Sequence, residues 1–108
     1  MDKRWTVQDR YQNDIYISEQ AWEHIIAPEN HPEMAEYEEH LRETLQKGHR
    51  RQDLLNPRKY RYSYAFDDLC EDNTHLVAIV LFGFTKDRQL DQIVPNNYVV
   101  TAFLKEIG

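Results

Sequence analysis

The chain has 108 residues, of which 41% are hydrophobic and 30% charged, and its formal net charge is −6. This length supports one modest core, so we expect residues 1–108 to form a single domain. No apolar run approaches the roughly 20 residues that a membrane span needs, and one cysteine excludes an intrachain disulfide. We therefore expect a cytoplasmic protein without a leader sequence and without a membrane partner.

The first predicted elements are a short extended segment and a helix. Residues 1–14 are polar with scattered aromatic residues, and we expect a loose segment or a short edge strand there. Asp14–Ile17 is a short extended segment. Ser18 is a suitable cap for a helix from Glu19 to about Ala27, which Pro28 ends.

A second helix is predicted between Asn30, its candidate cap, and Gly48, a glycine typical of helix ends. Apolar residues recur in it at intervals of three and four, which indicates one buried stripe. These residues are Met34, Tyr37, Leu41 and Leu45.

After this helix the period changes to alternation, which predicts three strands. In residues 60–66, aromatic side chains alternate with small or charged ones, and residues 75–84 are almost uniformly apolar, as in a central strand. Residues 86–96 are expected to form a loop before a last strand at 98–104. Since these connections are too short for helical crossovers, we expect antiparallel pairing and an α+β architecture.

Charge is distributed unevenly along the chain. Residues 19–43 hold eight glutamates and one arginine, whereas residues 47–61 hold six lysines and arginines and one aspartate. The acidic run is typical of the solvated face of a helix. The basic run is either a rim that binds phosphate groups or an ordinary basic loop facing the acidic helix, and the charge pattern favours neither.

Five short motifs follow one another between residues 14 and 104. They are Trp22-Glu23-His24-Ile25, His31-Pro32-Glu33-Met34, Arg50-Arg51, the strand Tyr60–Tyr64, and Val99-Val100-Thr101-Ala102-Phe103. In this order they resemble the nuclease-like domains of the barnase–EndoU–colicin–RelE (BECR) superfamily, which are associated with phages and toxins. The resemblance implies two N-terminal helices packed on a small curved antiparallel sheet. It also implies a metal-independent, cofactor-free site for RNA on the open face of that sheet, and a neutralising, antitoxin-type protein partner.

The resemblance also assigns site residues. Cleavage of RNA without a metal needs a base for the ribose 2′-hydroxyl, an acid for the leaving oxygen and cations for the phosphate. The candidate catalytic residues are His24, His31, Arg51, Tyr62 and Thr101. The candidate substrate-binding residues are Arg50, Arg61 and Lys59. The chain departs from the superfamily at Ser63, where an arginine is frequent.

Each candidate also has a structural explanation. His24 fits a hydrogen-bonded core histidine, His31 a local partner at a helix start, and the strand tyrosines ordinary packing. No histidine spacing or cysteine cluster indicates a metal site. Our hypothesis from the sequence is therefore a small metal-independent endoribonuclease of a toxin–antitoxin or phage-related system. The alternatives are a non-catalytic protein-interaction domain on the same scaffold and an RNA-binding domain without cleavage.

Overall fold

The computed structural model describes residues 2–107, and 42% of the chain lies in strands and 21% in helices. The elements in chain order are β1 (Lys3–Gln8), β2 (Asp14–Ser18), α1 (Glu19–Ile25), the 3₁₀ helix η1 (Pro32–Glu36), α2 (Glu38–Lys47), β3 (His49–Gln52), β4 (Lys59–Ala65), β5 (His75–Leu81), β6 (Phe84–Asp87), β7 (Gln92–Pro95) and β8 (Tyr98–Lys105).

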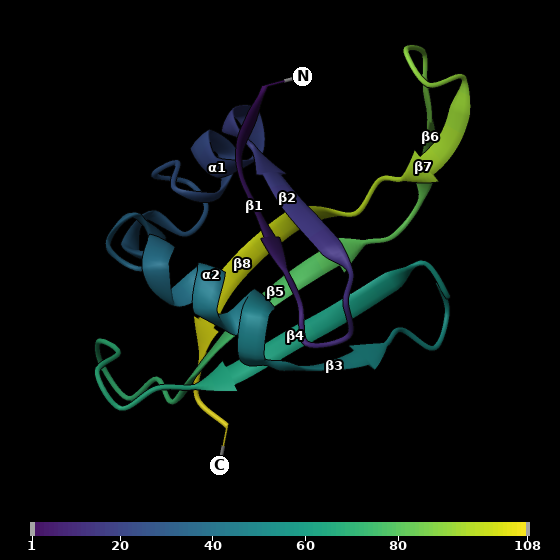
Figure 1. The fold of residues 1–108 in the computed structure, drawn as a ribbon. Helices are drawn as coiled ribbons and strands as arrows, with labels where there is room; N and C mark the ends of the chain where they lie inside the picture. The colour runs from purple at the N-terminus through teal and green to yellow at the C-terminus, as the bar shows by residue number, and fades with distance from the viewer. Residues whose placement is uncertain (1, 108) are drawn as a thin grey trace.

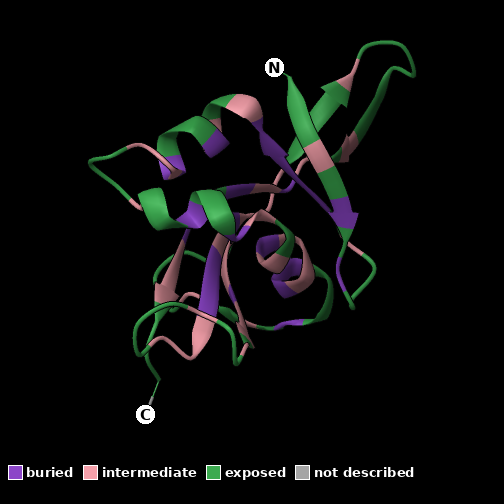
Figure 2. Ribbon diagram, turned by 90° about the vertical axis from the view of Figure 1, so that its left-hand side faces the viewer, coloured by how far each residue is buried: buried purple, intermediate pink, exposed green. Residues whose placement is uncertain are grey.

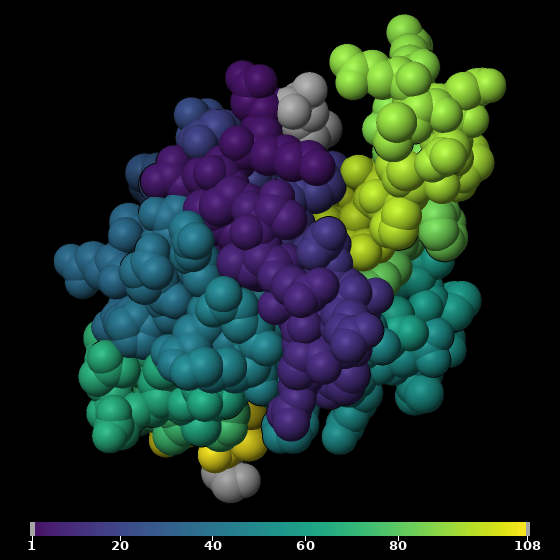
Figure 3. All heavy atoms as spheres, viewed as in Figure 1, coloured from purple at the N-terminus to yellow at the C-terminus, as the bar shows by residue number. Residues whose placement is uncertain are grey.

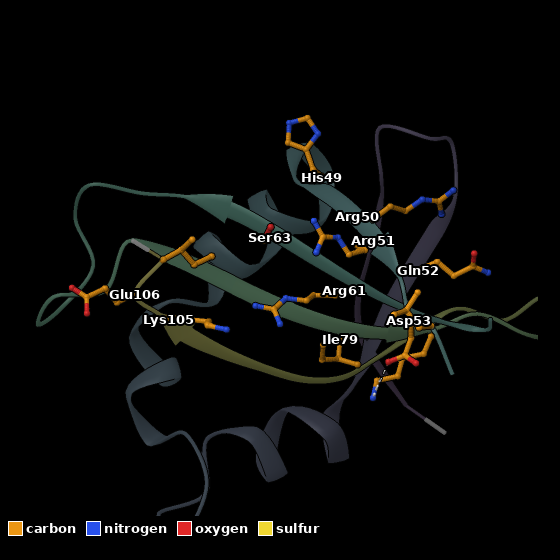
Figure 4. Close-up of a pocket in the computed structure, with 13 residues that line it drawn as sticks. His49, Arg50, Arg51, Gln52, Asp53, Arg61, Ser63, Ile79, Lys105 and Glu106 are labelled. Atoms are coloured by element: carbon orange, nitrogen blue, oxygen red, sulfur yellow. Dashed lines mark ion pairs between the residues drawn. The ribbon is translucent and has the colours of Figure 1, made fainter. Parts of the chain in front are cut away.

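Six strands form one curled sheet in the order β1-β2-β8-β5-β4-β3, while β6 and β7 form a separate hairpin that stands clear of the body (Figures 1 and 3). Neighbouring strands of the large sheet are antiparallel except β2 and β8, which run parallel where Tyr16 pairs with Tyr98. The helices cover one face of this sheet, and the buried residues of both layers face each other (Figure 2). Within residues 2–107, no helix covers the other face of β3, β4, β5 and β8 (Figure 4).

The predicted fold, two N-terminal helices on a small antiparallel sheet, is wrong. Two strands precede the helices, and the sheet has six strands, one pair of them parallel. Of the two alternatives for residues 1–14, the structure has the edge strand, β1, whose outer residues are polar and exposed, as an edge strand tolerates. Strands β3, β6 and β7 are each four residues long. Strand β7 and the second half of β6 lie in residues 86–96, which we expected to be a loop, and β3 lies in the basic run, for which we predicted no strand.

The predicted helices are present with different ends. Ser18 caps α1 as expected, since its hydroxyl accepts a hydrogen bond from the backbone N–H of Ala21 at 3.0 Å. The second predicted helix is instead broken at Tyr37 into η1 and α2. Asn30 is not its cap and donates its side-chain amide to the His24 carbonyl. The predicted apolar stripe on η1 and α2 is nevertheless buried in full.

The strand predictions were more accurate. Tyr60, Tyr62 and Tyr64 share one face of β4 and belong to the helix-covered side, whereas Arg61 and Ser63 lie on the opposite face. Alternation identified these faces because the side chains of a strand point in turn to either side of the sheet.

A buried hydrogen bond ties the two ends of the curled sheet together. The Tyr62 hydroxyl on β4 donates to the Asp9 carboxylate, which lies in the turn between β1 and β2. Asp9 also accepts from the backbone N–H groups of Tyr11 and Asn13 at 2.9 and 2.8 Å. Burial, followed by the hydrogen bond to Asp9, raises the pKa of Tyr62, so the hydroxyl stays protonated and available as a donor.

A second polar cluster fastens β1 to the helices. Arg4 forms ion pairs with Glu19 at the start of α1 and with Glu38 at the start of α2. The indole N–H of Trp5 donates to the same Glu38 carboxylate at 2.8 Å. These contacts explain why Glu38 begins α2, since its carboxylate sits at the helix N-terminus and faces β1.

Gly48 lets α2 end directly against β4. A Cβ atom at this position would lie 2.3 Å from the Thr44 carbonyl oxygen and 2.8 Å from that of Ser63, and both are backbone atoms that cannot turn aside. The chain therefore passes from helix to β3 without a loop. Within residues 2–107, no helix has the length and apolar character needed to cross a membrane.

We expect Tyr62→Phe to lower the free energy of unfolding by about 1–3 kcal/mol, because Asp9 then keeps a buried carboxylate with one donor fewer. Urea denaturation measures this change. Tyr64→Phe is the matched control, since the Tyr64 hydroxyl makes no hydrogen bond within the described chain. Equal midpoints for the two variants would contradict the structural role of the Asp9–Tyr62 bond.

Glu38 should make stability depend on pH. The hydrogen bond from Arg4 lowers the pKa of Glu38, so its contribution is complete above the unfolded-state pKa of about 4.3 and is lost as pH falls through the lower folded-state value. We expect Glu38→Gln to cost about 1 kcal/mol near neutrality and progressively less as pH falls below about 4. Glu23→Gln, at an exposed position without an ion pair in residues 2–107, should follow the wild-type profile.

Candidate functional site

The face of the sheet that the helices leave uncovered gathers positive charge. His49 of β3 pairs with Ser63 of β4, and Arg51 pairs with Arg61. Since paired residues in adjacent strands point to the same side, these four side chains share the face opposite to Tyr62. Figure 4 shows Arg51 and Arg61 projecting from neighbouring strands over this face.

A groove of about 750 Å³ lies on this face. We call it the open-face groove. It is lined by residues 49–54, Lys59, Arg61, Ser63, Ile79 and residues 105–107. Cationic groups from three strands and apolar contact from Ile79 therefore line one cavity, which is the composition expected where an anionic ligand lies on a sheet.

The charges of the open-face groove are only partly balanced. Lys59 lies 3.9 Å from Asp53, the one ion pair between groove residues in the described part of the chain. Arg51 and Arg61 have no carboxylate within 4.0 Å among residues 2–107, although they are direct cross-strand neighbours. Like charges in this position destabilise a sheet by roughly 0.2–1 kcal/mol. A phosphate bound between the two guanidinium groups would attract both of them and so offset their mutual repulsion.

Two further candidates continue the face towards β8. Thr101 pairs with Ile79, which in turn pairs with Arg61, so the three residues form one row across the sheet. Two strand spacings separate Arg61 from Thr101, or roughly 10 Å between backbones. Phe103 follows two residues later on the same side, and the His31 ring lies 5.7 Å from its ring. The His31 side chain remains 39% exposed.

Of the predicted site residues, four line the groove, namely Arg50, Arg51, Lys59 and Arg61, and four do not, namely His24, His31, Tyr62 and Thr101. Tyr62 is fully buried on the helix-covered side, where its hydroxyl is used by Asp9, so no substrate can reach it. Arg50 borders the groove, but its guanidinium carbon lies 4.4 Å from the Tyr11 ring centre and 4.5 Å from that of Tyr60. His24 is exposed on α1, and its side chain makes no hydrogen bond or ion pair with a groove residue in residues 2–107.

The structure also adds groove residues that the sequence did not single out. His49, Ser63 and Lys105 join Arg51 and Arg61 around the cavity (Figure 4). One signal for His49 was available, because alternation within 49–52 places it on the same face as Arg51 and not Arg50. Recognising that signal requires knowing that this segment is a strand. Among the described residues, no three histidine, cysteine, aspartate or glutamate side chains are grouped to hold a metal ion.

Comparison of the chain with protein-family models, with curated proteins and with solved structures finds no match.

The groove should bind polyanions through Arg51 and Arg61. We expect the double variant Arg51→Ala/Arg61→Ala to bind a single-stranded oligonucleotide more weakly and to lose about 1.4 from the slope of log affinity against log salt, since two phosphate contacts disappear. Fluorescence anisotropy at several salt concentrations measures both quantities. Lys86→Ala/Arg88→Ala removes two exposed cations from the β6–β7 hairpin and should leave the slope unchanged. An equal loss in both double variants would show that only net charge matters.

Proposed function

We propose that this protein is a small metal-independent endoribonuclease of the toxin type that binds RNA along the open-face groove. One observation carries the proposal: an exposed sheet face with two arginines side by side that have no ion-pair partner among residues 2–107 and, in the same row, a threonine hydroxyl. The His31 imidazole, which is 39% exposed, lies against Phe103, two residues along β8 from Thr101, and its Nδ1 atom is 3.7 Å from the Glu33 carboxylate. These are the group types that phosphodiester cleavage without a metal requires.

The reaction proposed for this face is an internal displacement. The ribose 2′-oxygen attacks the adjacent phosphorus, the bond from phosphorus to the 5′-oxygen breaks, and a 2′,3′-cyclic phosphate remains. One group takes the proton of the 2′-hydroxyl and another gives a proton to the departing 5′-oxygen. We assign His31 to one of these transfers and a solvent water molecule to the other, Thr101 to a hydrogen bond with a non-bridging oxygen, and Arg61 to the phosphate charge.

Arg51, Lys59 and His49 then hold the neighbouring part of the RNA strand. Arg51 and His49 lie on β3, three strand spacings from Thr101, and Lys59 lies two residues from Arg61 on β4. Arg50 belongs to the proposal only as the residue that fixes the β3 border, because its guanidinium is stacked between tyrosine rings. This differs from the sequence hypothesis, which gave catalytic roles to His24 and Tyr62 as well.

A protein-interaction role is the second candidate, and exposed apolar side chains favour it. Leu54 and Leu55 in the loop between β3 and β4 are 100% and 95% exposed, and Leu90 at the hairpin tip is 61% exposed. A neutralising partner that covers the groove would bury Leu54, which lines it. Stable co-purification with a partner, together with intact RNA after the partner is removed, would favour this role over catalysis.

The proposal predicts that His31→Ala and Thr101→Ala retain the fold but lose at least tenfold in cleavage rate, as expected when an acid–base group or an oxyanion donor is removed. Labelled RNA in chelator-containing buffer, resolved by gel electrophoresis, measures cleavage, and growth after induced expression measures toxicity. Thr85→Ala, at an exposed hairpin position, is the control for Thr101. His24→Ala should remain active.

Intact RNA with the wild-type protein, together with harmless expression, would refute the enzymatic proposal. Loss of cleavage in His24→Ala, with His31→Ala still active, would assign the imidazole of the reaction to α1 and contradict the role of His31.

A further inference from the structure

A second concavity lies on the other side of the sheet, at the base of the β6–β7 hairpin. It has a volume of about 580 Å³ and is mainly apolar. We call it the Phe84 hollow. Its lining includes the aromatic residues Tyr60, Phe82 and Phe84, the prolines 57 and 95, and the side chain of Arg58. None of these residues belongs to the catalytic row proposed above.

Arg58 is held in place but keeps its charge available. Its Nε atom donates to the Phe82 carbonyl oxygen at 2.8 Å. Gly83 makes room for it, since a Cβ atom there would lie 2.6 Å from the Arg58 Nη2 atom. No carboxylate lies within 4.0 Å of Arg58 among residues 2–107. A fixed guanidinium without a counter-ion at the rim of an apolar hollow is suited to a phosphate or another anion.

Phe84 offers an uncovered aromatic surface in the same hollow. Its side chain is 76% exposed, which is unusual for a phenylalanine. Tyr60 and Phe82, in contrast, pack against each other with ring centres 4.8 Å apart and against Arg50. Phe84 is therefore the aromatic ring of the hollow with a face available for a planar ligand.

We propose that the Phe84 hollow holds one nucleotide of a single-stranded RNA, whose base stacks on Phe84 while Arg58 binds its phosphate. This inference rests on the proposed function, because the same RNA strand occupies the open-face groove. Stacking of an unpaired base on an aromatic side chain, next to an arginine on the backbone, is the usual way in which proteins hold single-stranded RNA.

The two concavities meet at the start of β4. Consecutive residues there face opposite ways, so Lys59 lines the groove and Tyr60 lines the hollow. Pro57 and Arg58 precede them at this end of the sheet. A base must be unpaired to stack on Phe84, so we expect the hollow to take single strands.

The experiment combines a protein variant with a change in the ligand. The ligand is a 2′-O-methyl RNA decamer, in which the attacking oxygen is blocked, and a set of decamers with an abasic residue at each position in turn. We expect Phe84→Ala to weaken binding of the intact decamer roughly tenfold. For the decamer that lacks the stacked base, the affinity of the wild-type protein should fall by the same factor. The Phe84→Ala substitution should cause no further loss of affinity for that decamer.

Ile93→Ala is the matched control, because Ile93 is 67% exposed on the same hairpin and does not line the hollow. Equal affinities of the Phe84→Ala and Ile93→Ala variants for every decamer would overturn the inference. So would Phe84-dependent binding of a proline-rich peptide without any effect of Phe84 on RNA. In either case, if Arg51→Ala/Arg61→Ala still lowers RNA affinity, RNA binding by the open-face groove is supported and only the inference about the Phe84 hollow is refuted. If that variant binds normally while Phe84→Ala does not, RNA binds the hollow without the open-face groove, and both the groove and the inference of one strand across the two concavities are refuted.

Discussion

The arrangement of this protein depends on one buried contact between distant parts of the chain, the hydrogen bond from Tyr62 to Asp9. The turn after β1 lies at one end of the strand order and β4 near the other, so the sheet must curl for the two groups to meet. A buried carboxylate is costly unless donors surround it, and here two backbone N–H groups and a tyrosine hydroxyl supply them. The curl encloses α2 against the tyrosine face of β4 and thereby leaves the arginine face to solvent.

The alternation of side chains along β4 that buries Tyr62 in the core also places Arg61 on the open face. The packing that stabilises the fold therefore also forms the candidate site. A strand cannot turn its tyrosines inward without turning the intervening residues outward. Pairing with β3 then adds Arg51 next to Arg61, and pairing through β5 aligns Thr101 in the same row. The cationic face is thus a consequence of how the core is built, although the chain as a whole carries a net charge of −6.

The positions of the acidic residues agree with this separation of a buried tyrosine face from an exposed cationic face. Of the glutamates between residues 19 and 43, Glu19 and Glu38 are used to fasten Arg4 of β1. Glu23 and Glu29 are exposed, and none of the glutamates in this run lines the open-face groove, although Glu33 lies 3.7 Å from His31. Negative charge on one side and positive charge on the other would orient an approaching RNA towards the groove, an effect that weakens with salt.

The sequence by itself determined the elements whose signals are local. Ser18 capped a helix, apolar spacing identified the buried stripe through Leu41, and alternation assigned the two faces of β4, because each depends on residues a few positions apart. It did not determine the fold, since short polar strands such as β1 and β3 are stabilised only by their neighbours in the sheet. For the same reason it did not decide the site. Tyr62 and His24 matched a motif by their positions in the sequence. In the folded chain, however, the Tyr62 hydroxyl binds Asp9 and His24 lies outside the groove. His49 lines the groove only because β3 pairs with β4.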